Sequence, residues 1–249
     1  MKIVILYSGG LDSLIMYHLA GIKYPGAEIK CLYYRHGADS EIKEIQSLPS
    51  YVEVRNIDWL TDTKRPVAKQ SDPVAGNIYI PGRNLVFLTL ASCQELPDEV
   101  WLGPLIDETN DKATDKNFEF LKRASDVVNY ALSPFLRPYR PLSLRFPLAE
   151  NHWTKENALR WALENGLQKE KILGTVSCWH HDGHLPCGEC KQCFKRYMVF
   201  KLNGLEEKHY VHPLKSNNAE KFIYYYTNVQ NPTYDEAVVL DMMKRLDIS

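Results

Sequence analysis

The chain begins with an apolar run, Lys2–Tyr7 (KIVILY), that leads through a glycine pair, Gly9 and Gly10, into a helix-like stretch. An apolar run without polar alternation is typical of a strand buried on both faces. Strand-like and helix-like patterns continue to alternate through the first two-thirds of the chain. This alternation predicts βαβ units, and therefore an α/β fold with a parallel sheet and helices on both faces. Right-handed crossovers place the loops after the strands along one edge, where we expect the ligand.

The same patterns predict the individual elements. The proline-interrupted segment Arg137–Leu148 predicts an extended connector, and Tyr224–Tyr226 is strand-like. Glycines at 21 and 166 are expected to follow the ends of two helices. Strands are predicted at Lys2–Tyr7, Ile29–Tyr34, Val52–Ile57 and Val100–Leu105, and helices at Asp12–Ala20, Leu85–Glu95, Phe118–Leu132, Thr154–Asn165, Lys195–Leu202 and Tyr234–Leu246.

Charge and hydropathy argue against several classes of protein. Thirty basic and thirty-one acidic side chains give a net charge of −1, which argues against a protein that coats nucleic acid. No stretch approaches the ~18 consecutive apolar residues of a membrane-spanning helix. The apolar run Ile3–Tyr7 is shorter than the roughly 7–15 residues of a signal peptide's apolar region. We therefore expect a cytoplasmic protein that does not act at a membrane.

The string Ser8–Ser13 (SGGLDS) has the properties of an anion cradle. Glycines let the backbone turn tightly and approach a ligand, and the free N–H groups of a helix start favour an anion. Ser8 and Ser13 can add hydroxyl donors, and Asp12 can cap the helix or help to hold Mg²⁺. The string lacks the Gly-Lys-Ser/Thr ending of a Walker loop and the three spaced glycines of a dinucleotide fingerprint. The alternative is an ordinary tight turn before a capped helix.

Four cysteines fall close together in one segment: Cys178, Cys187, Cys190 and Cys193. In a cytosolic chain such a cluster favours a metal site over disulfides. Four thiolates complete the tetrahedral shell of a structural zinc ion, which would hold a loop too poor in apolar residues to fold alone. The alternatives are an iron–sulfur cluster, or a site in which a nearby histidine replaces one cysteine. The isolated Cys31 and Cys93 fall on apolar segments and are expected in the core.

Three of these stretches resemble a known family. Ser8–Ser13 is similar to the pyrophosphate loop of the N-type ATP pyrophosphatases, which cleave ATP between its α and β phosphates. The cysteine segment, with Arg196 and Phe200 after it, resembles the C-terminal signature of the 7-cyano-7-deazaguanine synthase family within that group. Ile80–Leu88 (IPGRNLVFL) is similar to another block of the same family. The three blocks occur in the family's order and cover roughly residues 2–200.

The resemblance implies a Rossmann-like (adenine nucleotide alpha hydrolase-like) fold. Residues 1–150 would form the ATP-pyrophosphatase domain, and residues 151–249 a helical region with the zinc site and the closing helices. It implies a ligase that forms C–N bonds and converts 7-carboxy-7-deazaguanine and ammonia to 7-cyano-7-deazaguanine (preQ0), by adenylation through an amide. ATP, Mg²⁺ and Zn²⁺ are the implied cofactors. Free ammonia is the expected nitrogen source because no glutaminase domain is recognisable. No stable nucleic-acid partner is expected, and a homodimer is compatible with the sequence.

The family's functional residues carry over onto matching positions of this chain. Those implied at the ATP site are Tyr7, Ser8, Gly9, Gly10, Leu11, Asp12, Ser13 and Leu14. Those implied for catalysis are Ser8, Asp12, Ser13 and Arg83, and those for the substrate are Arg83, Asn84, Asp107 and Asp115. Arg83 would hold a phosphate or carboxylate through its planar fork, and Asn84 would cap the helix that follows. The metal ligands are Cys178, Cys187, Cys190 and Cys193.

The chain departs from the family in two places. After the second predicted strand, Tyr34–Gly37 matches the family pattern only in part. After the fourth, Asp107–Asn117 stands where the family carries a substrate-recognising Tyr-Pro-Asp-Cys/Ser-Arg segment, with Lys116 and Asn117 in place of the arginine. Two other functions therefore stay open: a relative that stops at the amide or joins a deazaguanine-type acid to another amine, and a nucleic-acid-binding zinc protein without catalysis. A tRNA-thiolating enzyme would need a reactive cysteine near the ATP loop.

Overall fold

Five parallel strands form the central sheet, in the order β3-β2-β1-β6-β7. The computed structural model describes residues 1–35, 41–57, 65–66, 78–79, 82–109, 114–135, 140–178, 180 and 185–248. The chain runs outward from β1 through β2 to β3, and then places β6 and β7 on the other side of β1. The strands are β1 (Lys2–Leu6), β2 (Glu28–Arg35), β3 (Val52–Asn56), β6 (Glu99–Trp101) and β7 (Ser143–Arg145), and β4 (Arg65–Pro66) pairs with β5 (Ile78–Tyr79) in a separate antiparallel sheet.

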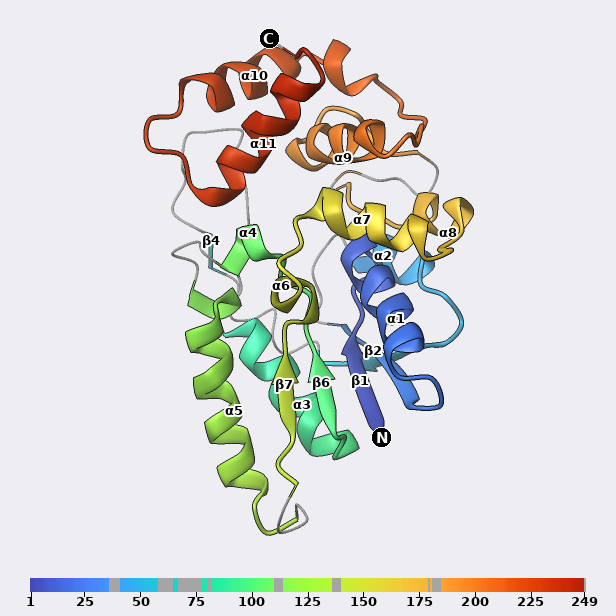
Figure 1. Cartoon of the computed structure of the whole chain (residues 1–249), viewed down its shortest axis with the longest axis vertical. Helices are drawn as coiled ribbons and strands as arrows, with labels where there is room; N and C mark the ends of the chain where they lie inside the picture. The colour runs from blue at the N-terminus through green and yellow to red at the C-terminus, as the bar shows by residue number, and fades with distance from the viewer. Residues whose placement is uncertain are drawn as a thin grey trace.

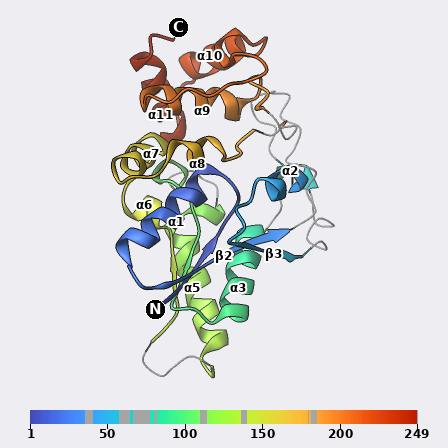
Figure 2. The ribbon, with the colours of Figure 1, turned by 90° about the vertical axis from the view of Figure 1, so that its right-hand side faces the viewer.

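Side chains of the sheet alternate between two hydrophobic cores. Ile3 of β1 belongs to the core on one face and its neighbour Val4 to the core on the other. Helix α1 (Leu11–Lys23) covers the first face, and α3 (Arg83–Glu95) and α5 (Phe118–Leu132) cover the second, as Figures 1 and 2 show. Because both faces are covered, the central strand β1 is apolar without polar alternation, whereas the edge strand β3 alternates apolar and polar residues. The predicted α/β, Rossmann-like sheet with helices on both faces is confirmed.

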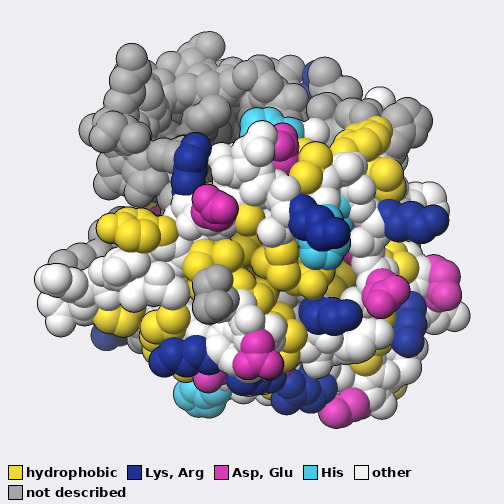
Figure 3. Space-filling model, turned by 90° about the horizontal axis from the view of Figure 1, so that it is seen from above, with side chains coloured by type: hydrophobic (Ala, Val, Ile, Leu, Met, Phe, Trp, Pro, Cys, Tyr) yellow, Lys and Arg dark blue, Asp and Glu magenta, His cyan; other side chains and the backbone are white. Residues whose placement is uncertain are grey.

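The remaining helices gather beyond the carboxyl ends of the strands (Figure 1). Helix α7 packs on α1, α9 packs on α7, and α10 and α11 pack on α9. Viewed from above, apolar side chains lie in the middle of this helical cap, with charged ones around them (Figure 3). Among the described residues, no helix is long and apolar enough to span a membrane. Besides α1, α3 and α5, the helices are α2 (Glu41–Gln46), α4 (Ile106–Thr109), α6 (Pro147–Glu150), α7 (Lys155–Glu164), α8 (Lys169–Leu173), α9 (Lys191–Leu202), α10 (Ala219–Asn228) and α11 (Tyr234–Arg245), with 3-10 turns at Thr114–Lys116 and Pro213–Lys215.

The proline-rich segment predicted as a connector contains the fifth strand. Within Arg137–Leu148, β7 pairs with β6 in parallel, so that Leu144 lies beside Val100. The prolines at 141 and 147 lie on either side of the strand, where they remove no hydrogen bond from the ladder. A three-residue strand has too few side chains to show a pattern, so it was identifiable only from its pairing.

Two predictions of local structure were wrong. Tyr224–Tyr226 lies in helix α10, where Phe222 and Tyr226, spaced four residues apart, are buried and Tyr224 is exposed. Gly21 does not end α1, which continues to Lys23. Nothing lies within 4 Å of a Cβ placed at Gly21, so the glycine is simply tolerated within the helix, at a cost of about 1 kcal/mol relative to alanine.

Helix α3 is less buried than its apolar sequence predicted. Its buried side chains include Asn84, Leu88 and Ala91, whereas Leu85 is exposed. Cys93 is also exposed, which corrects its expected place in the core, while Cys31 is buried as expected. One side of this helix covers the sheet and the other faces outward, so apolar composition alone overstated its burial.

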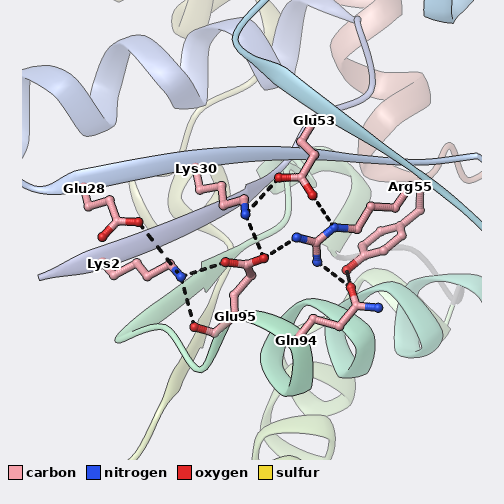
Figure 4. Close-up of polar contacts among 8 residues, drawn as sticks. Lys2, Glu28, Lys30, Glu53, Arg55, Gln94 and Glu95 are labelled. Carbon is pink, nitrogen blue, oxygen red and sulfur yellow. Dashed lines mark hydrogen bonds and ion pairs between the residues drawn. The ribbon is translucent and has the colours of Figure 1, made fainter.

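A network of charges fastens the end of α3 to the sheet (Figure 4). The Glu95 carboxylate oxygens lie 2.7 Å from Nζ of Lys2 and 2.9 Å from Nζ of Lys30, and the carboxylate also pairs with Arg55. Lys2 donates a further hydrogen bond to the Glu95 carbonyl at the helix end. Burial alone would raise the pKa of the Glu95 carboxyl, but the hydrogen bonds from the three cations outweigh it and lower the pKa to about 2.

Glu95→Gln is therefore expected to lower the free energy of unfolding by about 3 kcal/mol at pH 7. Because the pKa of Glu95 is lowered on folding, this stability is fully present above about pH 4.5 and is lost as the pH falls through about 2. Urea unfolding at pH 7, 4 and 2.5 should show the difference between variant and native chain shrinking toward acid. Glu28→Gln, at an exposed carboxylate 4.0 Å from Lys2, serves as the control and should cost less than about 1 kcal/mol. An equal loss in both variants would contradict the assignment.

Candidate functional site

The site lies at the carboxyl edge of the sheet, where β1 and β6 are neighbours and the chain changes direction. In open α/β sheets this switch point is where ligands bind. The loop after β1 is held open by Gly9, whose φ of +77° suits glycine, and Gly10 takes the N-cap position of α1. The backbone N–H of Val176 donates to the Gly9 carbonyl at 3.1 Å, which ties the loop to the segment before the cysteine cluster.

A cavity of about 210 Å³ opens on this loop. Three helices begin at its wall: α1 at Gly10 to Asp12, α7 at Lys155 and α9 at Gln192. Among the described residues, no side chain caps the start of α1, so its first backbone N–H groups are available to a ligand. Three positive helix ends at one cavity favour an anionic ligand. The lining residues are Ser8, Gly10, Leu11, Asp12, Glu44, Lys155, Val176, Ser177, Cys178 and Gln192.

An acid and a base face each other in this cavity. The Lys155 ammonium lies 3.0 Å from Oδ2 of Asp12, while Oδ1 of Asp12 is buried and has no hydrogen-bond partner among the described residues. Burial alone would lower the pKa of Lys155, but Asp12 and Glu108 raise it, so the lysine stays cationic. The expected cap role of Asp12 is wrong, since Gly10 is the N-cap. Its free oxygen instead fits a role in holding a cation such as Mg²⁺.

The predicted ATP-site residues divide into two groups. Ser8, Gly10, Leu11 and Asp12 line the cavity. Ser8 accepts a hydrogen bond from Gly10 N at 3.3 Å. The Ser13 hydroxyl donates to the Gly10 carbonyl at 2.8 Å and so shapes the loop. Tyr7 and Leu14 pack in the hydrophobic core beneath it, together with the buried Leu11 side chain.

Of the four predicted substrate residues, Arg83, Asn84 and Asp115 lie close together beside the cavity, whereas Asp107 faces Asp235 and Lys195. Arg83 begins α3, and the Asn84 side chain donates to the Asp115 carbonyl at 3.1 Å. Asn84 therefore joins two segments and does not cap α3, whose N-cap is Gly82. Burial raises the pKa of Glu44 on the cavity wall, and Arg83 lies close enough to that carboxyl to oppose the rise in part. Of the sequence segments compared with the family above, residues 36–37, 80–81, 110–113, 179 and 181–184 lie outside the described residues.

Glu108 links this group to the cavity. Its carboxylate accepts hydrogen bonds from the Lys116 ammonium at 2.7 Å and from the backbone N–H of Leu105 at 3.1 Å. Burial alone would raise the pKa of Glu108, but Lys116 and Lys155 lower it to about 2. Lys116, which stands where the family has a different segment, is thus engaged with Glu108.

Asp107 has the opposite electrostatic environment. It is 5% exposed, and within the part of the chain that the structure describes its Oδ1 atom has no hydrogen-bond partner. Burial, with Glu108 and Asp235 nearby, raises the pKa of Asp107 to about 6, and Lys195 opposes them. A buried carboxylate of this kind destabilises the folded chain at neutral pH and is typical of a group retained for binding or catalysis.

Asp107→Asn is expected to raise the free energy of unfolding at pH 7.5 by about 2 kcal/mol. A raised pKa means that the folded chain holds the proton more tightly, so the native carboxyl is least unfavourable below about pH 4 and costs most above about pH 6. The stability gain of the variant should therefore appear between these values and be nearly absent at pH 4. Thermal unfolding across this range measures it, and a variant no more stable at pH 7.5 than at pH 4, relative to the native chain, would refute the assignment.

The four clustered cysteines form one potential metal centre. Their sulfur atoms lie within 4.8 Å of one another, with Cys190 and Cys193 at 3.5 Å and Cys187 and Cys193 at 3.9 Å. Four thiolates around one ion at a metal–sulfur length of about 2.3 Å stand about 3.8 Å apart, so the arrangement fits tetrahedral coordination. Backbone N–H groups of His180 and Cys187 point at the Cys178 sulfur, each at 3.3 Å, and would stabilise a thiolate.

The metal centre adjoins the cavity through two residues. Cys178 itself lines the cavity beside Val176 and Ser177. The buried Arg196 of α9 donates to the hydroxyl of Ser177 at 3.1 Å and to that of Thr175 at 2.9 Å, and pairs with Glu207. The segment that bonds the Gly9 carbonyl is therefore held in place by the helix that contains Cys193 and has Cys190 as its N-cap.

Several residues of the cavity wall were missed from the sequence. They are Glu44, Lys155, Val176, Ser177 and Gln192. Glu108, which lies near Lys155 but outside the lining, was also missed. For Lys155 a signal existed, because a cation in the first turn of a helix opposes the helix dipole and needs a reason to be there. The others lie on segments without a motif, and only the fold brings them to the loop.

The chain is similar to several known proteins. The model of the family described as queuosine biosynthesis protein QueC matches residues 2–204. A 7-cyano-7-deazaguanine synthase of Nitratiruptor sp. is 27% identical over 228 residues, which are 84% of this chain and 97% of the relative. One of Methanocaldococcus jannaschii is 24% identical over 237 residues, 84% of this chain and 98% of the relative. A solved U34-tRNA thiolase NcsA of Methanococcus maripaludis, with its 4Fe-4S cluster, is 13% identical with a TM-score of 0.36, over 99% of this chain and 71% of the thiolase.

Proposed function

This chain belongs to the family described as queuosine biosynthesis protein QueC, and on that premise we propose that it converts 7-carboxy-7-deazaguanine and ammonia to 7-cyano-7-deazaguanine, using ATP. The observation that carries the proposal is the convergence of three helix N-termini, Lys155 and the unpartnered Oδ1 of Asp12 on one cavity. That arrangement suits a polyanion with a bound divalent cation.

The proposed chemistry activates two poor leaving groups, first the carboxylate oxygen and then the amide oxygen, by adenylation. The substrate carboxylate attacks the α phosphate of ATP, pyrophosphate departs, and an acyl adenylate forms. Ammonia adds to the acyl carbon, AMP leaves with the former carboxylate oxygen, and the amide results with release of a proton. The amide oxygen then attacks the α phosphate of a second ATP and displaces pyrophosphate. The bond between carbon and that oxygen breaks, AMP leaves with the oxygen, and loss of the two amide protons gives the nitrile. Each step depends on positioning and on stabilising charge on the departing pyrophosphate.

Within this scheme the chain's own residues have distinct tasks. The N–H groups at Gly10 to Asp12, with the Lys155 ammonium, would hold the departing pyrophosphate. Mg²⁺ would neutralise phosphate charge when held by Asp12. Arg83, on the substrate side, would bind the carboxylate or a phosphate through its fork. Ser8 and Ser13 keep the loop in shape through their hydrogen bonds with the Gly10 backbone.

We propose zinc for the four-cysteine centre. Its all-sulfur, closed ligand set is that of structural zinc sites, and the ion would supply a cross-link for the loop and the start of α9. Cys187→Ser should then lower stability and metal content before it alters chemistry. Elemental analysis of the purified chain distinguishes zinc from iron.

The deciding experiment incubates the chain with 7-carboxy-7-deazaguanine, ATP and ammonium and identifies the product by mass. The nitrile has the mass of the acid plus one ammonia minus two waters, and is therefore lighter than the acid. Its appearance together with AMP and pyrophosphate supports the proposal. Persistent amide, or another conjugate when other amines are present, would favour the alternative enzyme. Lys116 and Asn117, which replace the family's arginine, give that alternative its basis. Absence of AMP with this acid would overturn both substrate assignments.

A further inference from the structure

The last two helices lie beyond the family match but belong to the central fold. The match ends at residue 204, and α10 and α11 stand above α9 in Figure 1. Val239 and Met242 of α11 are buried in the same core as β1 and α1. The ring of Phe222 on α10 lies 5.4 Å from that of Phe194 on α9. These helices are thus fixed in position relative to the site.

The end of α11 reaches the start of α7. The Arg245 guanidinium donates to both carboxylate oxygens of Glu156, each at 2.7 Å. Such a bidentate pair fixes geometry as well as charge. Glu156 is 5% exposed and directly follows Lys155, whose ammonium faces Asp12 in the cavity. Because Lys155 and Glu156 share the first turn of α7, the pair holds the helix end that presents the lysine.

The start of α11 reaches the other side of the site. Asp235 pairs with Lys195 of α9, and α11 packs against α4, the short helix that carries Asp107 and Glu108. One helix therefore contacts α7, α9 and α4, and two of these reach the cavity wall, α7 with Lys155 and α9 with Gln192.

We propose that α11 is a positioning element of the nucleotide site, acting through Arg245 and Glu156 on Lys155. The inference rests on the proposed function only in taking the cavity as the ATP site. Arg245 lies far from the loop in sequence and acts on Lys155 only through Glu156. Because Lys155 belongs to the cavity taken as the ATP site, substitution of Arg245 should change the affinity for the nucleotide. It should not change the affinity for the deazaguanine acid.

Arg245→Met in the full chain is expected to weaken binding of α,β-methylene-ATP with Mg²⁺ about tenfold, measured by titration calorimetry. KM for ATP should rise similarly, and KM for the acid should stay within about twofold. Arg245→Lys should recover part of the affinity. A loss of folded protein alone would lower kcat and leave both KM values unchanged, so this split separates positioning from stability.

The control is Arg160→Met, which removes the other arginine paired with Glu156 without touching α11. It should leave nucleotide binding within about twofold, and a loss equal to that of Arg245→Met would overturn the inference. Glu156→Gln breaks the same link with little change of shape and tests it if Arg245→Met folds poorly. Glu156→Gln by itself should weaken nucleotide binding. Added to Arg245→Met in a double variant, it should weaken binding little further. Native-like affinity in Arg245→Met with weakened binding in Lys155→Met would overturn the inference and leave the proposed function intact. Native-like affinity in both Lys155→Met and Asp12→Asn would overturn the proposed function as well.

Discussion

Lys155→Met is expected to slow ATP-dependent pyrophosphate release about 100-fold or more while leaving the fold intact. Among the described residues that line the cavity, Lys155 is the one cationic side chain, and it lies 3.0 Å from Asp12. Its pKa is raised by Asp12 and Glu108 against the lowering effect of burial, so it carries its charge at the pH of the reaction. A fixed cation in a shielded site stabilises the charge that develops on the leaving pyrophosphate.

The matched control is Lys169→Met, because Lys169 also begins a helix but is exposed and lies outside the cavity lining. Pyrophosphate release by a coupled assay, with the acid and ammonium saturating, should be unchanged in this control. Lys155→Arg keeps the charge and should retain more activity than the methionine variant. Release by Lys155→Met within threefold of the native rate would exclude Lys155 as a pyrophosphate contact.

Gly188→Ala is expected to destabilise the chain by at least about 3 kcal/mol and to abolish metal retention. A Cβ on Gly188 would lie 1.6 Å from the carbonyl oxygen of Val211, and the φ of +77° is itself unfavourable for alanine. The clash involves backbone on both sides, because Val211 N donates to the Cys187 carbonyl at 3.2 Å. Relief would require Cys187 to move away from the other three sulfur atoms.

Gly204→Ala is the control that measures the cost of a positive φ without a steric clash. Its φ is +66°, but nothing lies within 4 Å of an added Cβ, so it should cost about 1 kcal/mol. For a chain of this size the two variants should differ in Tm by several degrees. Elemental analysis should find full metal content in Gly204→Ala and little in Gly188→Ala. Equal Tm values, or full metal content in both, would contradict the close packing at Gly188.

Sequence patterns predicted the fold best where they were long. The first three strands, the amphipathic helix Phe118–Leu132 and the C-terminal helix from Tyr234 were predicted close to their observed limits, because burial of one stripe leaves a periodic trace. The strand predicted at Val100–Leu105 ends at Trp101, and the helix predicted from Lys195 begins at Lys191. Strand β7 was missed and Tyr224–Tyr226 was misjudged, since a short segment contains too few residues to distinguish helix from strand.

The candidate site divides in the same way. The loop residues Ser8 to Asp12 and the four cysteines could be found from the sequence, because both kinds of site need a particular local spacing. The cap roles expected for Asp12 and Asn84 were wrong, because in both cases a glycine took the N-cap position and the side chain found a distant partner.

By itself, then, the sequence determined a parallel α/β sheet, an anion-binding loop after its first strand and a four-thiolate centre, since each depends on residues near one another in the chain. Only the tertiary structure decided that Lys155 faces Asp12, that Glu108 joins the two halves of the site, and that Arg245 braces the start of α7. These contacts join residues far apart in sequence, and nothing in local spacing records which helix ends will meet at the edge of the sheet.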